Sequence, residues 1–166
     1  RSTDAGISWM QQTSGTSSEL TAVSCPDEST GTAVGKSGTI IRTDDGGNTW
    51  RSQISGTTRD LYGVSFADAN NGTAVGASGS ILRTSDGGEH WTAQNSGTTS
   101  IIYGVDFTDA ATGTAVCWDG SILRSTDGGA SWKAQRSGTS SILFAVDFMD
   151  ANIGTVVGSG GIILRT

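Results

Sequence analysis

Residues 79–94, GSILRTSDGGEHWTAQ, carry the clearest structural pattern in this chain. A short run with apolar and β-branched residues, 79–84, is followed by a Ser-Asp-Gly-Gly turn and then by a second run, 89–94. Glycine adopts positive φ angles without a steric cost, so such a turn between two short runs is typical of a β-hairpin. The stretch therefore predicts two antiparallel strands joined by a tight turn.

The same pattern recurs at a step of 41 residues along the whole sequence. The step separates four tryptophans and the four aspartates of the turn: Trp9, Trp50, Trp91 and Trp132, and Asp4, Asp45, Asp86 and Asp127. A fixed period of about 40 residues with strand-like segments is the signature of a propeller or a solenoid. The four copies therefore predict a fold built from repeated units.

Each unit contains four strand-like runs, A to D, which lie at 61–66, 72–76, 80–84 and 89–94 in the second unit. Four short strands per unit predict an all-β fold, a β-propeller of four four-stranded blades. A helical solenoid is excluded because no segment has a 3.6-residue period. A β-helix remains an alternative, but its strands run parallel, whereas the Asp-Gly-Gly hairpins favour antiparallel neighbours.

We predict a single domain over residues 1–166. The chain opens with a D strand at 7–12, and its blades span 20–53, 61–94, 102–135 and 143–165. The frame is thus permuted: the last blade lacks its D strand, which the N-terminal strand can supply, removing an exposed sheet edge. This closure can occur within one chain, between two chains in an eight-bladed ring, or head to tail in a filament.

Composition narrows the classes of partner. The net charge is −6, and Lys36 and Lys133 are the only lysines, so binding to nucleic acid or to an anionic membrane surface is disfavoured. No apolar run approaches the roughly 20 residues that span a bilayer, so membrane insertion is not expected. The acidic, lysine-poor and Ser/Thr/Gly-rich makeup favours an extracytoplasmic or secreted location.

The turn sequences resemble a known motif. Residues 83–91, RTSDGGEHW, resemble the Asp-box, or BNR repeat, of sialidase-like propellers, which reads roughly Ser-x-Asp-x-Gly-x-Thr-Trp. Residues 43–50 and 125–132 match it as well, and 2–9 match with Ala5 in place of the first glycine. The longer pattern, with Ser-Gly-Thr after strand D and Gly-Thr-Ala-Val-Gly on strand B, looks like the photosystem II assembly-factor-like propellers.

This resemblance covers the entire chain and implies a role for the turns. In such propellers the Asp-boxes are structural turns on the rim, away from the ligand face. Carried over residue by residue, it implies structural roles for Asp4, Asp45, Asp86 and Asp127 and for Trp9, Trp50, Trp91 and Trp132. The four repeats are fewer than the six or seven blades that are usual there, so closure between chains is an alternative to closure within a single chain.

No residue is predicted to be catalytic. A glycosidase needs two carboxylates that face one pocket. Here the aspartates recur blade by blade, which favours turn capping: Asp27, Asp68, Asp109 and Asp150 share one position, and Asp106 and Asp147 another. His90 is the only histidine, so no multi-histidine metal site can form, and its place in the outermost strand beside Trp91 favours a solvated side chain over a Ser-His-Asp triad. We expect no metal and no cofactor.

The candidate binding site lies where the repeats differ. The B–C turns and the D–A loops share one face of a propeller, a face that commonly binds partners. The variable residues there are Trp118, Asp119, Lys36, Arg59, Asp60, Arg136 and Glu19. An exposed Trp118 beside Asp119 can stack on a sugar, anchor a protein or mediate assembly. The alternative is that it packs over a neighbouring blade or against Cys117.

The sequence therefore predicts a non-catalytic binding or assembly module. Its expected partner is a protein or a glycan on the Trp118 face, or further copies of the chain that join through the N-terminal strand. A glycosidase or sialidase-like enzyme is the alternative.

Overall fold

The computed structural model describes residue 2 and residues 4–166, and it is built almost entirely of short antiparallel strands. Within those residues lie fifteen strands and three single-turn 3-10 helices, η1 (Lys36–Gly38), η2 (Ala77–Gly79) and η3 (Ser159–Gly161). The strands are β1 (Leu20–Ser24), β2 (Gly31–Gly35), β3 (Ile40–Thr43), β4 (Arg51–Gln53), β5 (Leu61–Phe66), β6 (Gly72–Gly76), β7 (Ile81–Thr84), β8 (Thr92–Gln94), β9 (Ile102–Phe107), β10 (Gly113–Cys117), β11 (Ile122–Ser125), β12 (Lys133–Gln135), β13 (Leu143–Phe148), β14 (Gly154–Gly158) and β15 (Ile163–Arg165).

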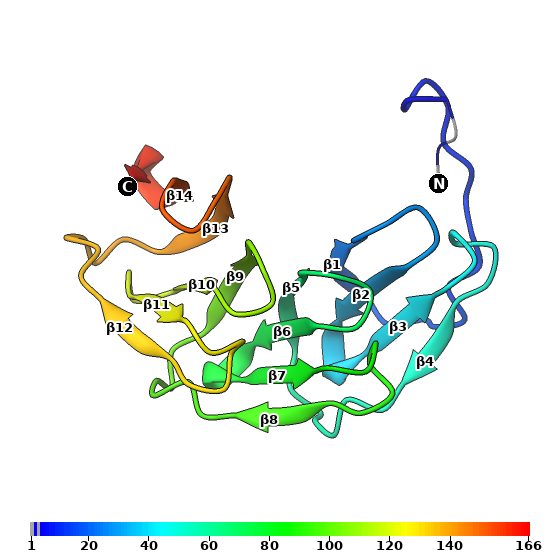
Figure 1. The fold of residues 1–166 in the computed structure, drawn as a ribbon, viewed down its shortest axis with the longest axis horizontal. Helices are drawn as coiled ribbons and strands as arrows, with labels where there is room; N and C mark the ends of the chain where they lie inside the picture. Colours follow the sequence, from blue (N-terminus) through cyan, green and yellow to red (C-terminus); the bar gives the residue numbers. More distant parts are fainter. Residues whose placement is uncertain (1, 3) are drawn as a thin grey trace.

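The strands form four separate sheets, which we call blades 1 to 4. Blades 1, 2 and 3 are four-stranded meanders, β1–β4, β5–β8 and β9–β12, and blade 4 has the three strands β13–β15. Every neighbouring pair is antiparallel. The blades fan around one side of a common axis, with β1, β5, β9 and β13 innermost (Figure 1). The predicted all-β propeller fold is confirmed.

The outer strands are shorter than the sequence predicted. β4 begins at Arg51 and β8 at Thr92, three residues after the expected starts at 48 and 89. The cause lies in the turn, where the Thr49 N–H donates to Asp45 Oδ1 (2.9 Å) and is not available to a neighbouring strand. The C strands also start late: the Ser80 N–H donates to Ala77 O and closes a 3-10 turn, so β7 begins one residue later than expected.

The N-terminal segment differs from its prediction. Residues 7–12, expected to form a D strand, lie in a loop and form no strand in the described part of the chain. Figure 1 shows the two chain ends on opposite sides of the opening in the arc of blades. β15 therefore has an unpaired outer edge in this single chain, and closure of the ring stays a prediction.

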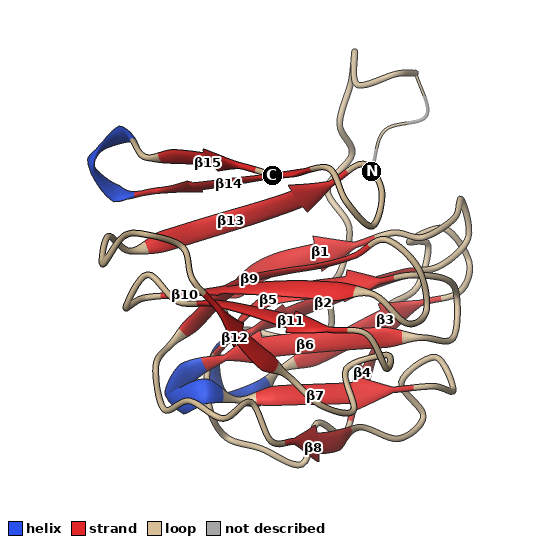
Figure 2. Ribbon diagram, turned by 60° about the vertical axis from the view of Figure 1, so that its left-hand side comes forward, coloured by secondary structure: helices blue, strands red, loops and turns tan. Residues whose placement is uncertain are grey.

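The core lies between the blades. Val75 and Ile81 of blade 2 pack with Ile102, Val105 and Leu123 of blade 3 in one buried cluster, and equivalent clusters join blades 1 and 2 and blades 3 and 4. Figure 2 shows the successive sheets stacked face to face in this way. Each blade is consequently stabilised mainly by its neighbours, as expected for a repeat protein.

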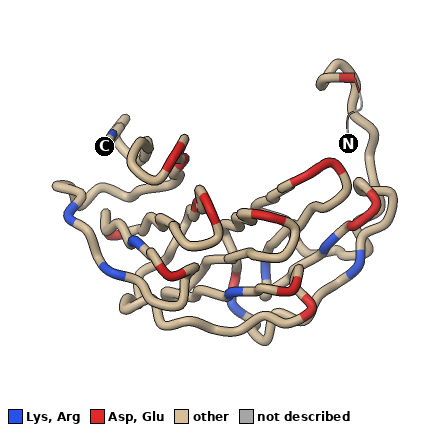
Figure 3. The backbone as a smooth tube through the Cα atoms, in the orientation of Figure 1, with Lys and Arg blue, Asp and Glu red and all other residues tan. Residues whose placement is uncertain are grey.

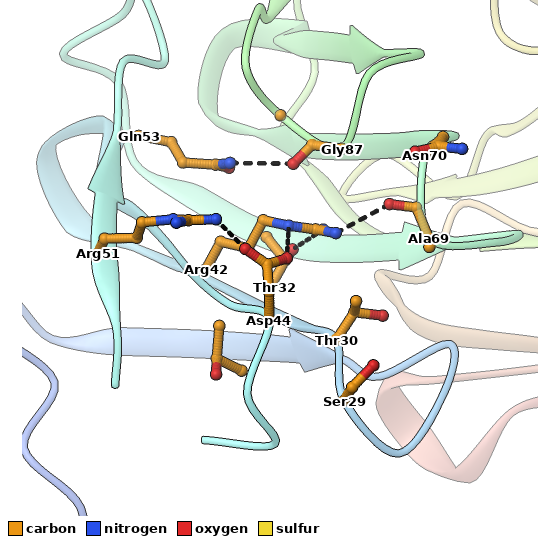
Figure 4. Close-up of polar contacts among 12 residues, drawn as sticks. Ser29, Thr30, Thr32, Arg42, Asp44, Arg51, Gln53, Ala69, Asn70 and Gly87 are labelled. Atoms are coloured by element: carbon orange, nitrogen blue, oxygen red, sulfur yellow. Dashed lines mark hydrogen bonds and ion pairs between the residues drawn. The ribbon is translucent and has the colours of Figure 1, made fainter. Parts of the chain in front are cut away.

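Polar groups repeat across the same junctions. The Phe66 N–H donates to Ser24 Oγ (3.0 Å), and the Phe148 N–H donates to Asp106 Oδ2 (2.8 Å). On the outer side of blade 1, Arg42 Nη2 donates to Ala69 O of blade 2 (2.9 Å; Figure 4). The inner strands approach closely, since a Cβ at Gly63 would lie 2.9 Å from the Tyr103 carbonyl oxygen.

Candidate functional site

The candidate site lies where the B–C turns meet the D–A loops. The Lys36 N–H donates to Glu19 O, the Ala77 N–H to Asp60 O and the Trp118 N–H to Ile101 O, each at 2.9 Å. The turn after the second strand of each blade is thus tied to the segment before its first strand. The two sets of variable loops consequently share one end of the sheets.

An aromatic row occupies this end of the inner strands. Tyr62, Tyr103 and Phe144 hold the same repeat position on β5, β9 and β13, and blade 1 has Thr21 there. The ring centroids of Tyr62 and Tyr103 lie 5.4 Å apart, and those of Tyr103 and Phe144 lie 5.7 Å apart. We call these three residues, together with Trp118, the aromatic row.

Trp118 extends the row toward solvent. Its ring centroid lies 6.1 Å from that of Tyr103, and the residue is 50% exposed. Contacts at this distance between tilted rings are favourable and hold the indole in place. Trp118 thus packs on its own blade and still presents an open surface.

An ion pair borders the row at blades 1 and 2. Lys36 Nζ lies 3.1 Å from Asp60 Oδ2 and 5.1 Å from the centre of the Tyr62 ring. The Ser37 N–H also donates to Asp60 Oδ1 (2.9 Å). That backbone hydrogen bond, with the Lys36 ammonium, lowers the pKa of Asp60, and the bond to Asp60 raises the pKa of Lys36. Both groups are therefore charged at neutral pH.

The other predicted site residues are more dispersed. Asp119 and Arg136 line one shallow depression on blade 3, where Asp119 Oδ1 accepts hydrogen bonds from Ser121 N (3.1 Å) and Oγ (2.6 Å). Arg59 Nη1 donates to Ser80 Oγ (3.4 Å) in a separate groove that blades 1 and 2 line together. Glu19 is exposed at the open side of blade 1. The structure thus brings together Lys36 with Asp60 and Asp119 with Arg136.

The sequence prediction omitted most of the aromatic row from the site. Tyr62 and Tyr103 recur at the 41-residue step, as does Phe144, whereas the sequence prediction took only residues that vary between the repeats. Their facing position at the end of the inner strands is a property of the blade arrangement. Three aromatic residues at one repeat position of an inner strand are the signal that points to them.

The carboxylate oxygens of the turn aspartates accept hydrogen bonds from groups in their own turns. In blade 3, Asp127 Oδ1 accepts hydrogen bonds from the Ser131 N–H (2.9 Å) and Ser125 Oγ (2.9 Å), and Oδ2 accepts one from Ser131 Oγ (2.6 Å). The side-chain bond from Ser131, followed by the backbone bonds and that from Ser125, lowers the pKa of Asp127 to about 2. Asp4, Asp45 and Asp86 have matching bonds.

The four tryptophans of the repeat differ in their contacts and exposure according to their place in the arc. Trp91 and Trp132 meet Phe66 and Phe107 edge to face, with centroids 6.0 and 5.9 Å apart. Trp50 Nε1 donates to Gln12 Oε1 (3.3 Å). Trp9, at the N-terminal end, is highly exposed.

The remaining aspartates stabilise turns and blade junctions. Asp68 Oδ1 accepts the N–H groups of Asn70 (2.7 Å) and Asn71 (2.9 Å), and Asp109 and Asp150 make equivalent bonds. Burial raises the pKa of Asp106, against the effect of the hydrogen bond from Phe148. Within residue 2 and residues 4–166, no group of three or more His, Cys, Asp or Glu side chains could hold a metal ion.

Two further features bear on the chemistry of this surface. Burial raises the pKa of the Cys117 thiol to about 11, so the residue before Trp118 is a poor nucleophile. Acidic residues recur in the loops of every blade, and basic residues lie both on strands and in loops (Figure 3). None of the helices in the described residues is long and apolar enough to cross a membrane.

The comparisons with known proteins concern the fold. No family model matches the chain, and no curated protein does. Among solved structures, YCF48 bound to D1 peptide is similar, with a TM-score of 0.74 and 23% identity over 91% of this chain and 50% of that one. YCF48 from Cyanidioschyzon merolae gives 0.77 and 20% over 97% and 52%. The chain thus spans about half the length of these structures.

Two other structures show how widely the fold is used. The computationally designed Ika4 protein has a TM-score of 0.77 and 19% identity, with 95% of this chain and 98% of that chain covered. A GH74 enzyme from Niastella koreensis has a TM-score of 0.75 and 16% identity, with 88% and 28% covered. Since the same fold carries binding proteins and enzymes, function has to be argued from the site.

Proposed function

We propose that this protein is a non-catalytic recognition module that binds an extended protein segment along the aromatic row. The observation that carries the proposal is the alignment of Tyr62, Tyr103 and Phe144 on three successive inner strands, with Trp118 half exposed beside them. Aromatic side chains dominate the energy of protein interfaces because they bury a large area at a small entropic cost. Such a row offers aromatic faces to the apolar side chains of one segment.

Charged groups next to the aromatic row can fix the direction in which a peptide binds. Lys36 and Asp60 stand together at the blade 2 end, and Asp119 lies beside Trp118. A peptide whose backbone crosses the row can exchange hydrogen bonds with these groups and with the tyrosine hydroxyls. The likeness to YCF48 bound to D1 peptide supports a peptide as the class of ligand over a glycan.

A binding role also fits the carboxylates better than the glycosidase alternative. Inverting and retaining glycosidases need a pair of carboxyl groups about 5–10 Å apart with unequal roles at one sugar ring. Here Asp68, Asp109 and Asp127 hold backbone N–H groups of their own turns. Hydrolysis of a panel of aryl glycosides that is lost in Asp106→Asn would contradict the non-catalytic proposal.

Selection from a phage-displayed library of random dodecapeptides tests the binding role. We expect enriched peptides to bind Tyr103→Ala and Trp118→Ala at least tenfold more weakly than the unaltered protein, since tenfold corresponds to about 1.4 kcal/mol. Trp9→Ala is the matched control, because Trp9 is exposed but lies outside the row. Equal binding by all four proteins, or binding only to an array of glycans, would refute peptide recognition along the row.

Two further assignments belong to the same proposal. The four Asp turns are of the Asp-box type, supported by their shared hydrogen bonds from Ser, Thr or His at the fourth residue after the aspartate. The protein works outside the cytoplasm, for which its acidic, lysine-poor composition is the support. Fractionation of the source cells with an antibody against the chain checks the location, and recovery in the cytoplasmic fraction would contradict it.

A further inference from the structure

We propose that the 166-residue chain pairs with a second copy of itself, and that blade 4 of each copy seats on blade 1 of the other to close an eight-bladed ring. This surface lies at the ends of the arc and is separate from the aromatic row. The proposal rests on a comparison that the 41-residue repeat makes possible: each residue at an end of the arc has counterparts within it.

Blade 4 exposes the residues with which blades 1 to 3 contact their successors. Val157 is 41% exposed, and its counterparts Val34, Val75 and Val116 are fully buried. Ile163 is 69% exposed, compared with 1% for Ile40 and Ile81. The outer face of blade 4 is therefore a blade-junction surface that the single chain does not cover.

Blade 1 exposes the residues with which blades 2 to 4 contact the blade before them. Leu20 is 39% exposed, whereas its counterparts Leu61, Ile102 and Leu143 are fully buried. Val23 is 61% exposed, compared with 8% for Val64 and Val105.

The two exposed sets are the partners of each other. At the junction of blades 1 and 2, Val34 and Ile40 pack against Leu61 and Val64 in one cluster. Val157 and Ile163 of blade 4 correspond to the first pair, and Leu20 and Val23 of blade 1 to the second. Joining blade 4 to blade 1 would therefore recreate this packing with closely similar residues.

The N-terminal segment already stands in the place of a preceding D strand. Trp50 Nε1 donates to Gln12 Oε1 (3.3 Å), just as Trp91 Nε1 donates to Gln53 Oε1 of β4 (3.2 Å). A cavity of about 440 Å³ separates this segment from blade 1, with Gln12, Leu20 and Val23 among its lining residues. A three-stranded blade inserted here would acquire its missing fourth strand.

The pairing of β3 with β4 gives the register in which residues 7–12 would pair with β15. In blade 1, Ile40, Ile41 and Arg42 of β3 face Gln53, Ser52 and Arg51 of β4. A shift by the repeat places Ile163 opposite Gln12 and Leu164 opposite Gln11. The side chains at residues 7–12 thus match an edge that β15 leaves open.

Polar groups at the ends are complementary in the same way. Asp106 accepts the Phe148 N–H across a junction, and its counterpart Asp147 would accept the N–H of Cys25 in the second copy. A Cβ at Gly38 would lie 2.0 Å from Thr57 O, so this glycine is tightly covered, whereas Gly161 has nothing within 4 Å. Thr16 of the second copy is the repeat counterpart of Thr57 and fits over Gly161.

A second copy would cover the exposed junction surfaces of blade 1 and blade 4 at the same time. The ends of one chain lie on opposite sides of the opening (Figure 1), so self-closure would require the whole arc to tighten. A copy related by a two-fold axis presents blade 1 to blade 4 and blade 4 to blade 1, which closes the assembly. Four blades from each chain then make the ring.

Light scattering of the purified chain tests the pairing. We expect a mass twice the 16.9 kDa of one chain, independent of concentration over the micromolar range. Ile163→Asp places a charge in the proposed junction and is expected to reduce the mass to that of one chain. Ile54→Asp is the matched control: Ile54 is exposed and its counterparts Asn95 and Arg136 are polar, so the mass should stay doubled. A single-chain mass or an open series of masses for the unaltered protein would overturn the proposal.

A cross-link tests the register even if Ile163→Asp fails to fold. Opposed residues in antiparallel strands have Cα atoms about 4.5–5.5 Å apart, within reach of a disulfide. A chain with Gln11→Cys and Leu164→Cys, with exposed Cys25 changed to Ala and buried Cys117 kept, should oxidise to a covalent dimer on a non-reducing gel. A cross-linked monomer or a ladder of larger species would contradict closure by two copies.

Discussion

The junctions inside the arc and the two ends of the arc are made of almost the same residues, yet they have opposite environments. Ile81 of blade 2 is buried against blade 3, and Ile163, its counterpart in blade 4, is exposed. The side chain and its place in the repeat are shared, but Ile81 has a next blade beside it and β8 along the edge of its strand, whereas Ile163 has neither. In a repeat protein, burial is therefore a property of the interface between units.

The largest expected effect comes from truncating the counterpart isoleucines. Ile81→Ala removes a buried side chain and leaves a cavity, so it should lower the free energy of unfolding by about 3–4 kcal/mol. Ile163→Ala should cost less than about 0.5 kcal/mol in dilute protein, because the side chain is then exposed. At concentrations where two copies pair, its cost should rise toward that of Ile81→Ala. Urea unfolding at one protein concentration below the micromolar range and one within it measures the difference. An equally small cost for Ile163→Ala at both concentrations would remove the link between the ends.

The next largest effect on stability is expected from substituting Gly79 and Gly161, which hold the same position in the B–C turns of blades 2 and 4. Gly79 has φ +68°, and a Cβ there would lie 2.0 Å from Thr98 O, so Gly79→Ala should destabilise the fold by about 2–3 kcal/mol. Gly161 has φ +76° but open space around it, so Gly161→Ala should cost only the backbone strain, about 1 kcal/mol, in dilute protein. Thermal unfolding of both variants checks the order, and equal losses would show that backbone strain alone sets the cost.

Substituting a turn aspartate should affect acid unfolding more inside the arc than at its N-terminal end. The pKa of Asp127 is about 2, below its unfolded value of 3.8, so its ionised form stabilises the fold above pH 4 and this contribution is lost as the pH falls through 2. Asp127→Asn should therefore destabilise the protein at pH 7 and flatten its acid transition.

Asp4→Asn is the control for this effect. It removes an equivalent set of bonds in a turn whose Trp9 is exposed, so it should change global unfolding less than Asp127→Asn does. Circular dichroism between pH 7 and 2 follows both variants. An unchanged acid profile in Asp127→Asn would contradict the structural role of the turn.

The smallest effect concerns Asp106, whose carboxylate lies within a junction. Burial raises its pKa, so ionisation in the folded state is disfavoured, and the contribution present below pH 3.8 is lost as the pH rises through the folded pKa. Asp106→Asn keeps an oxygen for the Phe148 N–H and should stabilise the fold at pH 7 by less than about 1 kcal/mol, with no gain near pH 3. Glu89→Gln, at an exposed carboxylate, is the control for urea unfolding at both pH values, and a loss of stability in Asp106→Asn would contradict this account.

The repeat, the strands and their order could all be predicted from the amino-acid sequence. Strands β1, β2, β5 and β6 lie within a residue of the expected bounds, because alternating apolar residues and glycine-rich turns are local signals that each unit carries. The pattern also indicated that Trp118 is partly exposed, since a large aromatic in a short turn has few places to pack. The late starts of β4 and β8 were missed because side chains of the turn capture N–H groups that a strand would use.

The arrangement of the blades in space sets which residues of the repeat are in contact and which remain exposed. The fan of blades brings Tyr62, Tyr103 and Phe144, each 41 residues from the next, within 6 Å of a neighbour. It buries Val34 and exposes Val157, although the two occupy the same place in their blades. The physical reason is that secondary structure follows from signals a few residues apart, whereas burial depends on the relative position of whole blades, which no single repeat encodes.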